Sequence, residues 1–517
     1  MFSRRMVLRG AGVALAVLFL GMVSRFWHPY YGFTRFIQMD ESDERVAVSA
    51  VKSGAVFVYA GSNGYDGATY AQIAVDPSLR DRELPQAIQN LPYRARRILT
   101  SFVAWTVAGG RPAAIAPTYA ALNIAVWLAL ALVGWRLLRV DDARSFAVWA
   151  GFLCSAGVLH SVRLALTDAF ATLLFAWALT AAERGRWRWG AAVLGVAGLA
   201  RESILATALA FVPPAAVRAR RWRELLFAGV VVCAPLSVWL VYVTLTVGNA
   251  GEGWGNFSAP LVGLFGKLKE VVTGLDPREP WWLLRFGTAI SFVALLSQAA
   301  YVLRHRDLED RWWRSALGGL AMMACFGTAV WEGNPGAATR VLLPLSLAVA
   351  VLIVRRRSGW HWVVLTNLTV LSGVLAFVHV PRHANEFTAG RAGGLGYVAE
   401  LRSGWYGREE AGRHFWTWTA GGGEIAMRTT AGAPTAATLT LRLRALSPRR
   451  VTLRVNGLER WAGEVGTEAI PVTVPVQATR TLRLELASEA APVTEGARAD
   501  ARLLGFAVYD LGLAAAR

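Results

Sequence analysis

Charged residues and cysteine are both scarce in this chain. Asp, Glu, Lys and Arg make up 17% of the 517 residues, and 55% are hydrophobic. A soluble globular protein carries about 25% charged residues, so the composition excludes a soluble enzyme and a disordered chain. The three cysteines, Cys154, Cys233 and Cys325, all lie within apolar runs. The sequence therefore predicts neither a disulfide framework nor a cysteine metal site.

Lysine is rarer still. Lys52, Lys267 and Lys269 are the only lysines, so arginine carries nearly all of the positive charge behind the net +19. A charge of this size is common in nucleic-acid-binding proteins. Here, however, the arginines lie mainly between long apolar runs, where membrane topology uses them. The sequence predicts a polytopic α-helical membrane protein with membrane lipids, and no nucleic acid, as partners.

Eleven apolar runs are candidate transmembrane helices. The first, 6–23, follows Arg4 and Arg5 and has no small-residue cleavage site after it, so we expect a retained helix with a cytoplasmic N-terminus. All loops then predicted to be cytoplasmic are basic, as the positive-inside rule requires. An odd number of spans leaves the C-terminus outside. The other ten runs are 113–138, 144–160, 166–183, 188–200, 203–217, 225–247, 281–303, 313–331, 338–354 and 361–379.

Two further regions complete the predicted plan. Residues 24–97 form a long first outer loop, and residues 95–110 are apolar but short, which is typical of an interfacial helix. From residue 384 the hydrophobic period becomes two, as in 438–444, with turn signals such as Asn456-Gly457. We expect a transmembrane domain over 1–383 and an outer β-sandwich over 384–517. Its tryptophans either bind carbohydrate or pack in a core; they are Trp405, Trp416, Trp418 and Trp461.

The first outer loop is the most informative segment for function. It is longer than topology requires, and long ordered loops are usually functional. It contains Gly64-Tyr65-Asp66-Gly67, whose glycines permit a tight turn that presents the Asp66 carboxylate at a helix start. On spacing alone, Asp66 is either a functional acid or simply a helix N-cap.

The segment from Asp66 to Ala74, with Tyr70-Ala71 and Ile73-Ala74, resembles the first-loop motif of the GT-C superfamily of membrane glycosyltransferases. It is closest to the branch of protein O-mannosyltransferases and the lipid A aminoarabinose transferase, where the motif reads roughly Asp-Glu-x-x-Tyr-Ala-x-Ile-Ala. The stretch 93–99 resembles a Tyr-Arg-x-x-Arg segment of uncharacterised bacterial members. The predicted plan over 1–380 is also similar. One departure is Gly67, where the family has a second acid, and it argues against a metal site built on an adjacent acid pair.

The resemblance implies transfer of a sugar from a polyprenyl-phosphate donor to an envelope glycan, lipid or protein. The reaction would take place at the periplasmic face of a bacterial inner membrane, usually with inversion. Such a transfer needs a carboxylate that takes the acceptor proton and cations that stabilise the departing phosphate. Asp66 is the candidate base, and its motif neighbours Tyr65 and Tyr70 are candidate substrate-binding residues. The candidate phosphate ligands, because arginine grips phosphate in a bidentate fork, are Arg94, Arg96, Arg97 and Arg340. The first three are equally suited to anionic lipid headgroups.

Charged residues at other outer helix ends are further candidates for substrate binding. In the resembling families an acid at the outer end of an early core helix lines the active site. Asp168 fits that place, although Asp168 and Arg163 would also serve as a helix-capping pair. Arg201 and Glu202 lie at a depth where charges either line a cavity or pair with each other. Glu332 lies at the outer end of a later helix.

No metal-ligand cluster and no nucleotide-binding glycine motif is visible in the sequence, so no cofactor is predicted. A divalent cation held by Asp66 and Asp168 is compatible with the sequence, although no residue pattern indicates one. The alternative function is a transporter or flippase of a lipid-linked glycan, which many helices and membrane-depth charges would also suit. That alternative predicts inverted repeats, which the hydropathy pattern lacks, and it gives residues 24–97 no role.

Overall fold

The computed structural model describes residues 4–52, 55–59, 63–249, 254–381, 385–412, 414–494 and 502–516. The chain divides into two compact units, which we describe separately. The first comprises Met1–Phe26 and Phe33–Val380, and the second comprises Trp27–Gly32 and Pro381–Arg517. The predicted domain boundary at 383/384 lies outside the described residues. Trp27–Gly32, which the sequence analysis placed in the first outer loop, belongs to the second unit.

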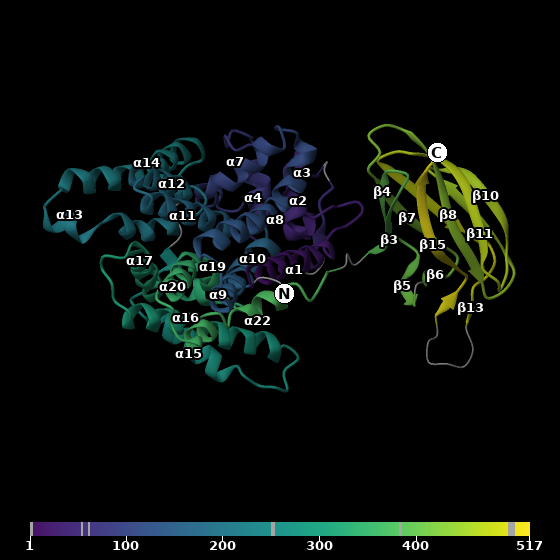
Figure 1. Ribbon diagram of the computed structural model, residues 1–517. Coiled ribbons are helices and arrows are strands. Elements are labelled where there is room, and N and C mark those ends of the chain that lie inside the picture. The colour runs from purple at the N-terminus through teal and green to yellow at the C-terminus, as the bar shows by residue number, and fades with distance from the viewer. Residues whose placement is uncertain are drawn as a thin grey trace. The chain divides into compact units, whose positions relative to one another are not determined.

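The first unit is helical, as the purple to green ribbons in Figure 1 show. Among the described residues, five stretches are long and apolar enough to cross a membrane. They are α1 (Arg4–Ser24), α8 (Pro112–Leu137), the stretch of α9 (Ala143–Leu153) and α10 (Ala156–Arg163), α14 (Trp222–Val247) and α16 (Trp282–Arg304). The chain thus has several long apolar helices, as expected for a membrane protein, whereas the count of eleven stays a prediction.

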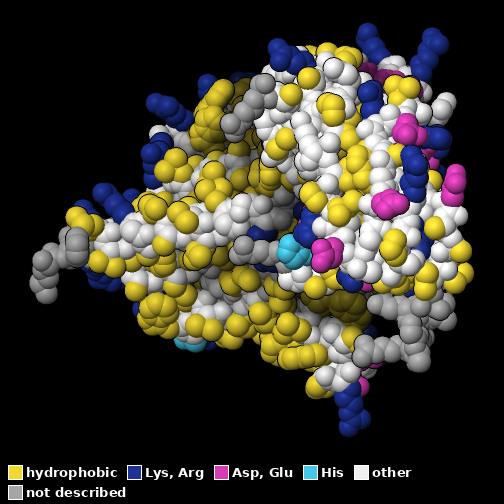
Figure 2. Space-filling view, turned by 90° about the vertical axis from the view of Figure 1, so that its right-hand side faces the viewer, with side chains coloured by type: hydrophobic (Ala, Val, Ile, Leu, Met, Phe, Trp, Pro, Cys, Tyr) yellow, Lys and Arg dark blue, Asp and Glu magenta, His cyan; other side chains and the backbone are white. Residues whose placement is uncertain are grey.

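The surface of these helices is apolar. On α14, for example, Val238 is 70% exposed and Leu245 is 82% exposed. Figure 2 shows broad patches of exposed hydrophobic side chains between groups of dark blue basic ones. Apolar patches of this extent are unusual on proteins surrounded by water, so this surface suits contact with lipid.

Shorter helices pack tightly against the long ones. α11 (Asp168–Glu183) packs on α12 (Trp187–Gly198), and α17 (Arg311–Cys325) packs on the 3₁₀ helix η3 (Glu202–Phe211). The last contact depends on Gly318, because a Cβ there would lie 2.0 Å from the carbonyl oxygen of Ala206. The remaining helices of this region are α13 (Pro214–Arg218), η4 (Trp254–Asn256), α15 (Val262–Thr273), α18 (Thr328–Trp331), α19 (Ala338–Val341), α20 (Leu343–Arg355), α21 (Trp360–Thr366) and α22 (Val370–Leu375).

Residues 24–97, the predicted first outer loop, fold into short elements. Two strands of two residues each, β1 (Met39–Asp40) and β2 (Val58–Tyr59), pair in parallel. The helix that follows the loop, α7 (Ile98–Val107), has ten residues and is too short to cross a bilayer, and its interfacial position stays a prediction. The other elements are η1 (Thr34–Phe36), α2 (Glu41–Val46), α3 (Ser49–Lys52), α4 (Asp66–Ile73), α5 (Leu84–Ala87), α6 (Leu91–Arg94) and η2 (Ala95–Arg97).

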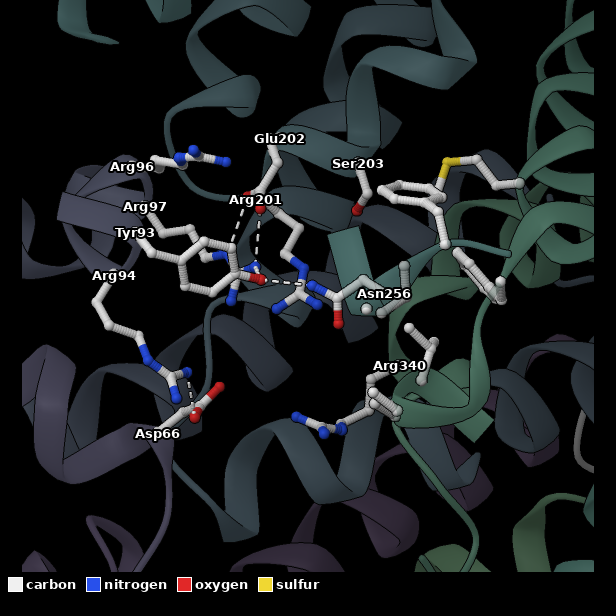
Figure 3. A pocket seen from close by; sticks show the side chains of 18 of the residues that line it. Asp66, Tyr93, Arg94, Arg96, Arg97, Arg201, Glu202, Ser203, Asn256 and Arg340 are labelled. Atoms are coloured by element: carbon white, nitrogen blue, oxygen red, sulfur yellow. Dashed lines mark hydrogen bonds and ion pairs between the residues drawn. The ribbon is translucent and has the colours of Figure 1, made fainter. Parts of the chain in front are cut away.

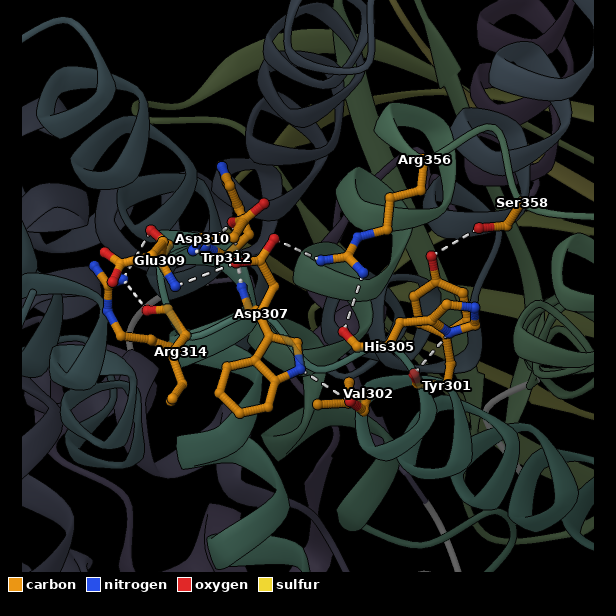
Figure 4. Close-up of polar contacts among 12 residues, drawn as sticks. Tyr301, Val302, His305, Asp307, Glu309, Asp310, Trp312, Arg314, Arg356 and Ser358 are labelled. Atoms are coloured by element: carbon orange, nitrogen blue, oxygen red, sulfur yellow. Dashed lines mark hydrogen bonds and ion pairs between the residues drawn. The ribbon is translucent and has the colours of Figure 1, made fainter. Parts of the chain in front are cut away.

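The loop 305–310 between α16 and α17 is held by polar contacts with the neighbouring helix ends (Figure 4). Asp310 caps α17 by accepting a hydrogen bond from the backbone N–H of Trp312 at 2.7 Å. Arg356 donates to Asp307 at 2.9 Å, and Arg314 donates to the carbonyl oxygen of Leu308 at 2.6 Å. Arginines that the sequence analysis used only for topology therefore also satisfy acceptors at helix ends.

The second unit is a sandwich of two antiparallel sheets. Their strand orders are β10-β9-β12-β7-β4-β3 and β11-β8-β15-β6-β5. Side chains from both sheets form one core, and along β8 the residues Leu439, Leu441 and Leu443 alternate with more exposed ones. The predicted all-β region is confirmed. Its strands are β3 (Glu386–Ala392), β4 (Leu395–Leu401), β5 (Trp405–Ala411), β6 (His414–Thr419), β7 (Gly422–Thr429), β8 (Thr435–Ala445), β9 (Arg449–Val455), β10 (Leu458–Val465), β11 (Ile470–Ala478), β12 (Thr481–Ala487), β13 (Val493–Thr494), β14 (Leu503–Leu504) and β15 (Phe506–Ala515).

The tryptophans of this unit take different positions. Trp405 and Trp461 pack against the main core. Trp418 is buried in a smaller cluster, where Trp416 is partly buried. Trp416 also stacks on Tyr509, with ring centroids 5.5 Å apart. All four tryptophans thus have packing contacts within this unit.

Candidate functional site

A cavity of about 1210 Å³ lies in the helical unit. Four parts of the chain line it: the first outer loop with η2, residues 201–206, residues 255–257 and residues 322–341. Five arginines and two carboxylates are among the lining residues, so the cavity is positively charged. Figure 3 shows these charged groups facing one another. The predicted site residues that line it are Tyr65, Asp66, Arg94, Arg96, Arg97, Arg201, Glu202 and Arg340.

Asp66 is the first residue of α4, and Tyr65 occupies the N-cap position before it. The carboxylate of Asp66 pairs with Arg94, whose Nη1 lies 2.5 Å from Oδ1. Burial raises the pKa of Asp66, but the guanidinium groups of Arg94, Arg97 and Arg340 outweigh this effect and hold the pKa below its usual value. Asp66 is therefore ionised at neutral pH and able to accept a hydrogen bond from a hydroxyl group.

Gly67, the residue after Asp66, approaches two backbone segments closely. A Cβ at this position would lie 2.5 Å from the carbonyl oxygen of Leu164 and 2.7 Å from that of Ile37. No side chain fits there unless the backbone moves. The adjacent acid pair of the resembling families is thus absent from the sequence and also has no room in this structure.

Arg97 and Glu202 form a tight ion pair inside the cavity wall. Arg97 donates from Nε and Nη2 to the two carboxylate oxygens of Glu202, at 2.9 and 2.8 Å. Arg97 also donates to the hydroxyl of Tyr70 at 2.7 Å. Such a bidentate pair is strong and directional. It ties η2 and α4 of the first outer loop to the start of η3, and it places Tyr70 behind the cavity wall.

Arg201 and Arg340 come from different elements and share one carboxylate, that of Asp168. Arg201 Nε lies 3.3 Å from Asp168 Oδ1, and Arg340 Nη1 lies 3.8 Å from Oδ2. Asp168 is the first residue of α11 and only 2% exposed, and it lies behind the two arginines. Arg340 also donates to the hydroxyl of Tyr65 at 2.6 Å.

Tyr93 is a further cavity residue, although the sequence analysis used it only as part of a motif. The guanidinium groups of three neighbouring arginines lie 5.2 to 5.8 Å from the centre of its ring. Its hydroxyl accepts a hydrogen bond from Asn256 at 2.8 Å. The motif signal could have identified Tyr93, whereas Asn256 has no sequence signal, because its loop reaches the site only in the folded chain.

Besides Tyr70 and Asp168, which lie behind the cavity wall, two predicted site residues are not part of the described cavity lining. Arg163 is buried and lies over the ring of Phe26, with its guanidinium 4.7 Å from the ring centre. Glu332 is exposed. In contrast, part of the cavity wall is apolar and includes Phe257, Met322, Phe326, Val330 and Val341. Within the described residues, no group of three or more His, Cys, Asp or Glu side chains is arranged to hold a metal ion.

No family model and no curated protein matches the chain. A solved structure entitled "CBM4 structure and function" matches 23% of this chain and 87% of its own chain, at 7% identity and a TM-score of 0.17.

Proposed function

We propose that this protein is a membrane glycosyltransferase that moves a sugar from a polyprenyl-phosphate donor to an envelope acceptor, with Asp66 as the general base. One observation carries the proposal: an ionised carboxylate shares a cavity with five arginines, and the same cavity has an apolar wall. These are the three environments that the acceptor hydroxyl, the donor phosphate and the prenyl chain require.

The donor is an anion with a lipid tail. A cavity whose charged lining is mostly arginine attracts anions and stabilises the negative charge that builds up on a departing phosphate. The apolar side chains from Phe257 to Val341 suit the first prenyl units. The exposed apolar helices suit a protein embedded in lipid, from which such a donor enters. We place the reaction at the periplasmic face of a bacterial inner membrane.

In the proposed reaction, the acceptor oxygen attacks the anomeric carbon of the sugar. The bond from that carbon to the phosphate oxygen breaks, and the polyprenyl phosphate leaves with the electron pair. The acceptor proton passes to the carboxylate of Asp66 and then to solvent. A single displacement of this kind inverts the anomeric centre. The reaction as written needs no cofactor, and its products are a glycosylated acceptor and polyprenyl phosphate.

Arg94 has a separate task in this scheme. Its contact with Asp66 keeps the carboxylate charged and fixes its direction. A base with a lowered pKa is weak, so Asp66 accepts the proton only as the acceptor hydroxyl becomes acidic in the transition state. The other arginines of the cavity then bind the leaving phosphate.

The test is a mass-spectrometric comparison of envelope glycans and glycolipids. The strains are wild type, a deletion, and the deletion complemented with Asp66→Asn or with the control Glu41→Gln. Glu41 is an exposed acid in the same loop, and membrane levels of both variants are measured. We expect the deletion and Asp66→Asn to lack the same sugar and Glu41→Gln to restore it.

The outcome also separates the proposal from transport of a lipid-linked glycan. A transporter has no use for a base, so Asp66→Asn would restore the missing glycan at wild-type protein level. That result would refute the assignment of Asp66 and favour the transport alternative.

A further inference from the structure

The charge pairs around the cavity are of two kinds. The pair between Arg97 and Glu202 is bidentate, with both contacts below 3.0 Å. The contacts of Arg201 and Arg340 with Asp168, at 3.3 and 3.8 Å, lack hydrogen-bond geometry. In the described part of the chain, neither oxygen of Asp168 has a hydrogen-bond partner, although the carboxylate is only 2% exposed.

A buried carboxylate without hydrogen bonds is unusual, because desolvation of the charge is then only partly compensated. Here the compensation is electrostatic and comes from two arginines on separate elements. Arg201 precedes η3 and Arg340 lies in α19. Figure 3 shows both guanidinium groups directed towards the middle of the cavity, where a ligand would lie.

We propose that Asp168 is a resident counter-ion: it holds Arg201 and Arg340 in place while the cavity is empty, and the phosphate group of a ligand takes over both arginines. Asp168 is then a positioning residue and touches neither substrate nor leaving group. The choice of phosphate as the anion rests on the proposed function. The division of the arginines rests on the contacts alone: Arg97 stays with Glu202, and the loosely paired Arg201 and Arg340 bind the ligand.

A resident counter-ion has a specific consequence when its charge is removed. Asp168→Asn keeps the shape but removes the one carboxylate among the described residues that lies within 4 Å of either arginine, which lowers the stability of the empty protein. A bound phosphate supplies the missing charge and no longer meets a neighbouring carboxylate. Phosphate should therefore stabilise Asp168→Asn more than it stabilises the wild type, with binding about tenfold tighter.

The experiment measures the melting temperature of the full chain in nanodiscs against ligand concentration. The probes are inorganic phosphate and a short-chain alkyl monophosphate, with chloride at equal ionic strength as the reference. The proteins are wild type, Asp168→Asn, Asp168→Asn with Arg340→Gln, and the control Arg139→Gln. Arg139 is an exposed arginine that lines a separate cavity, so this control loses one positive charge elsewhere.

We expect Asp168→Asn to melt lower than wild type without phosphate and to regain most of the loss with it. The double variant restores the charge balance, so it should melt higher than Asp168→Asn and respond little to phosphate. Arg139→Gln should respond as wild type. A response to the alkyl phosphate alone would assign the site to a lipid headgroup, and equal responses would assign it to phosphate as such.

If Asp168→Asn melts lower than wild type and phosphate does not restore the melting temperature, the proposal is overturned. Asp168 would then be an ordinary member of a buried ion pair. If Asp168→Asn does not fold even with phosphate, Arg340→Gln alone decides, because the proposal requires at least about tenfold weaker phosphate binding there. Failure of the glycosyltransferase proposal is seen separately, in the glycan comparison with Asp66→Asn. If phosphate rescues Asp168→Asn but the glycans of the Asp66→Asn strain are intact, the anion site is supported and the assignment of Asp66 as the base is refuted.

Discussion

Gly67→Ala tests whether the position of Asp66 depends on the close packing of α4. An alanine Cβ would meet the carbonyl oxygens of Leu164 and Ile37 at 2.5 and 2.7 Å, whereas ordinary contact begins at 3.4 Å. Both neighbours are backbone atoms, so relief requires the start of α4 to move by roughly 0.7 to 0.9 Å. Overpacking of this kind costs about 1–3 kcal/mol.

The same shift should affect catalysis much more than stability. A misplacement of about 1 Å lowers a rate by roughly a hundredfold, whereas 1–3 kcal/mol lowers the melting temperature of a chain this size by only several degrees. We therefore expect Gly67→Ala to remain in the membrane and to lose most of its sugar transfer. The measurements are the glycan comparison described above and the melting temperature of the purified chain.

The control is Gly229→Ala on α14. A Cβ at Gly229 meets no atom within 4 Å, and alanine favours a helix over glycine, so both readouts should stay at wild-type values or improve. Full activity together with an unchanged melting temperature in Gly67→Ala would refute the reasoning. The close approach of α4 to its neighbours would then not position the carboxylate.

Three further variants test other contacts. Arg94→Gln removes the first of the charges that lower the pKa of Asp66; that pKa should rise, and the acid limb of the transfer rate should shift to higher pH, while an unchanged pH profile would count against Asp66 as the base. Glu202→Gln leaves Arg97 buried without its partner and should lower the free energy of unfolding by about 3–5 kcal/mol, seen as a lower melting temperature. Leu443→Ala in the sandwich core should cost about 2–5 kcal/mol, and a loss below 1 kcal/mol in denaturant unfolding would contradict the shared core.

The β-sandwich was the most predictable part of the fold, because its signals are local. Alternation along β8 places Leu439, Leu441 and Leu443 on one face. Asn456 and Gly457 both have positive φ, which is the conformation that a two-residue hairpin turn requires. The attachment of Trp27–Gly32 was not predictable, since it depends on long-range contacts such as His28 Nε2 lying 3.3 Å from Glu386.

The helices were predictable in kind and less so in extent. The run 203–217, predicted as one span, is η3 followed by α13; Val212 and Pro213 separate the two, and Pro214 is the first residue of α13. Proline has no N–H to donate, so a helix cannot continue through the pair without losing hydrogen bonds. The hydropathy of the run is the same in either case, which is why an apolar pattern alone overestimates its length.

The composition of the candidate site was predictable, but its pairing was not. Arg201 and Glu202 are neighbours in the sequence, which left open whether they pair with each other or line a cavity. Arg201 has an extended backbone, with φ −153° and ψ 115°, at the point where η3 begins. Successive side chains in extended backbone point to opposite sides, so Arg201 reaches Asp168 and Glu202 reaches Arg97.

This division gives one dipeptide two different tasks. Glu202 forms a bidentate ion pair with Arg97 that fixes the first outer loop to η3, so the position of Arg97 does not depend on a ligand. Among the described residues, the nearest carboxylate oxygen to Arg201 is 3.3 Å away on Asp168, which Arg340 shares, so the guanidinium of Arg201 gains more from a phosphate than Arg97 would. Exchange of the two residues, Arg201→Glu with Glu202→Arg, would keep the composition and the net charge of the cavity. It would nevertheless place glutamate beside Asp168 and arginine beside Arg97, and the like charges would destabilise both contacts at once.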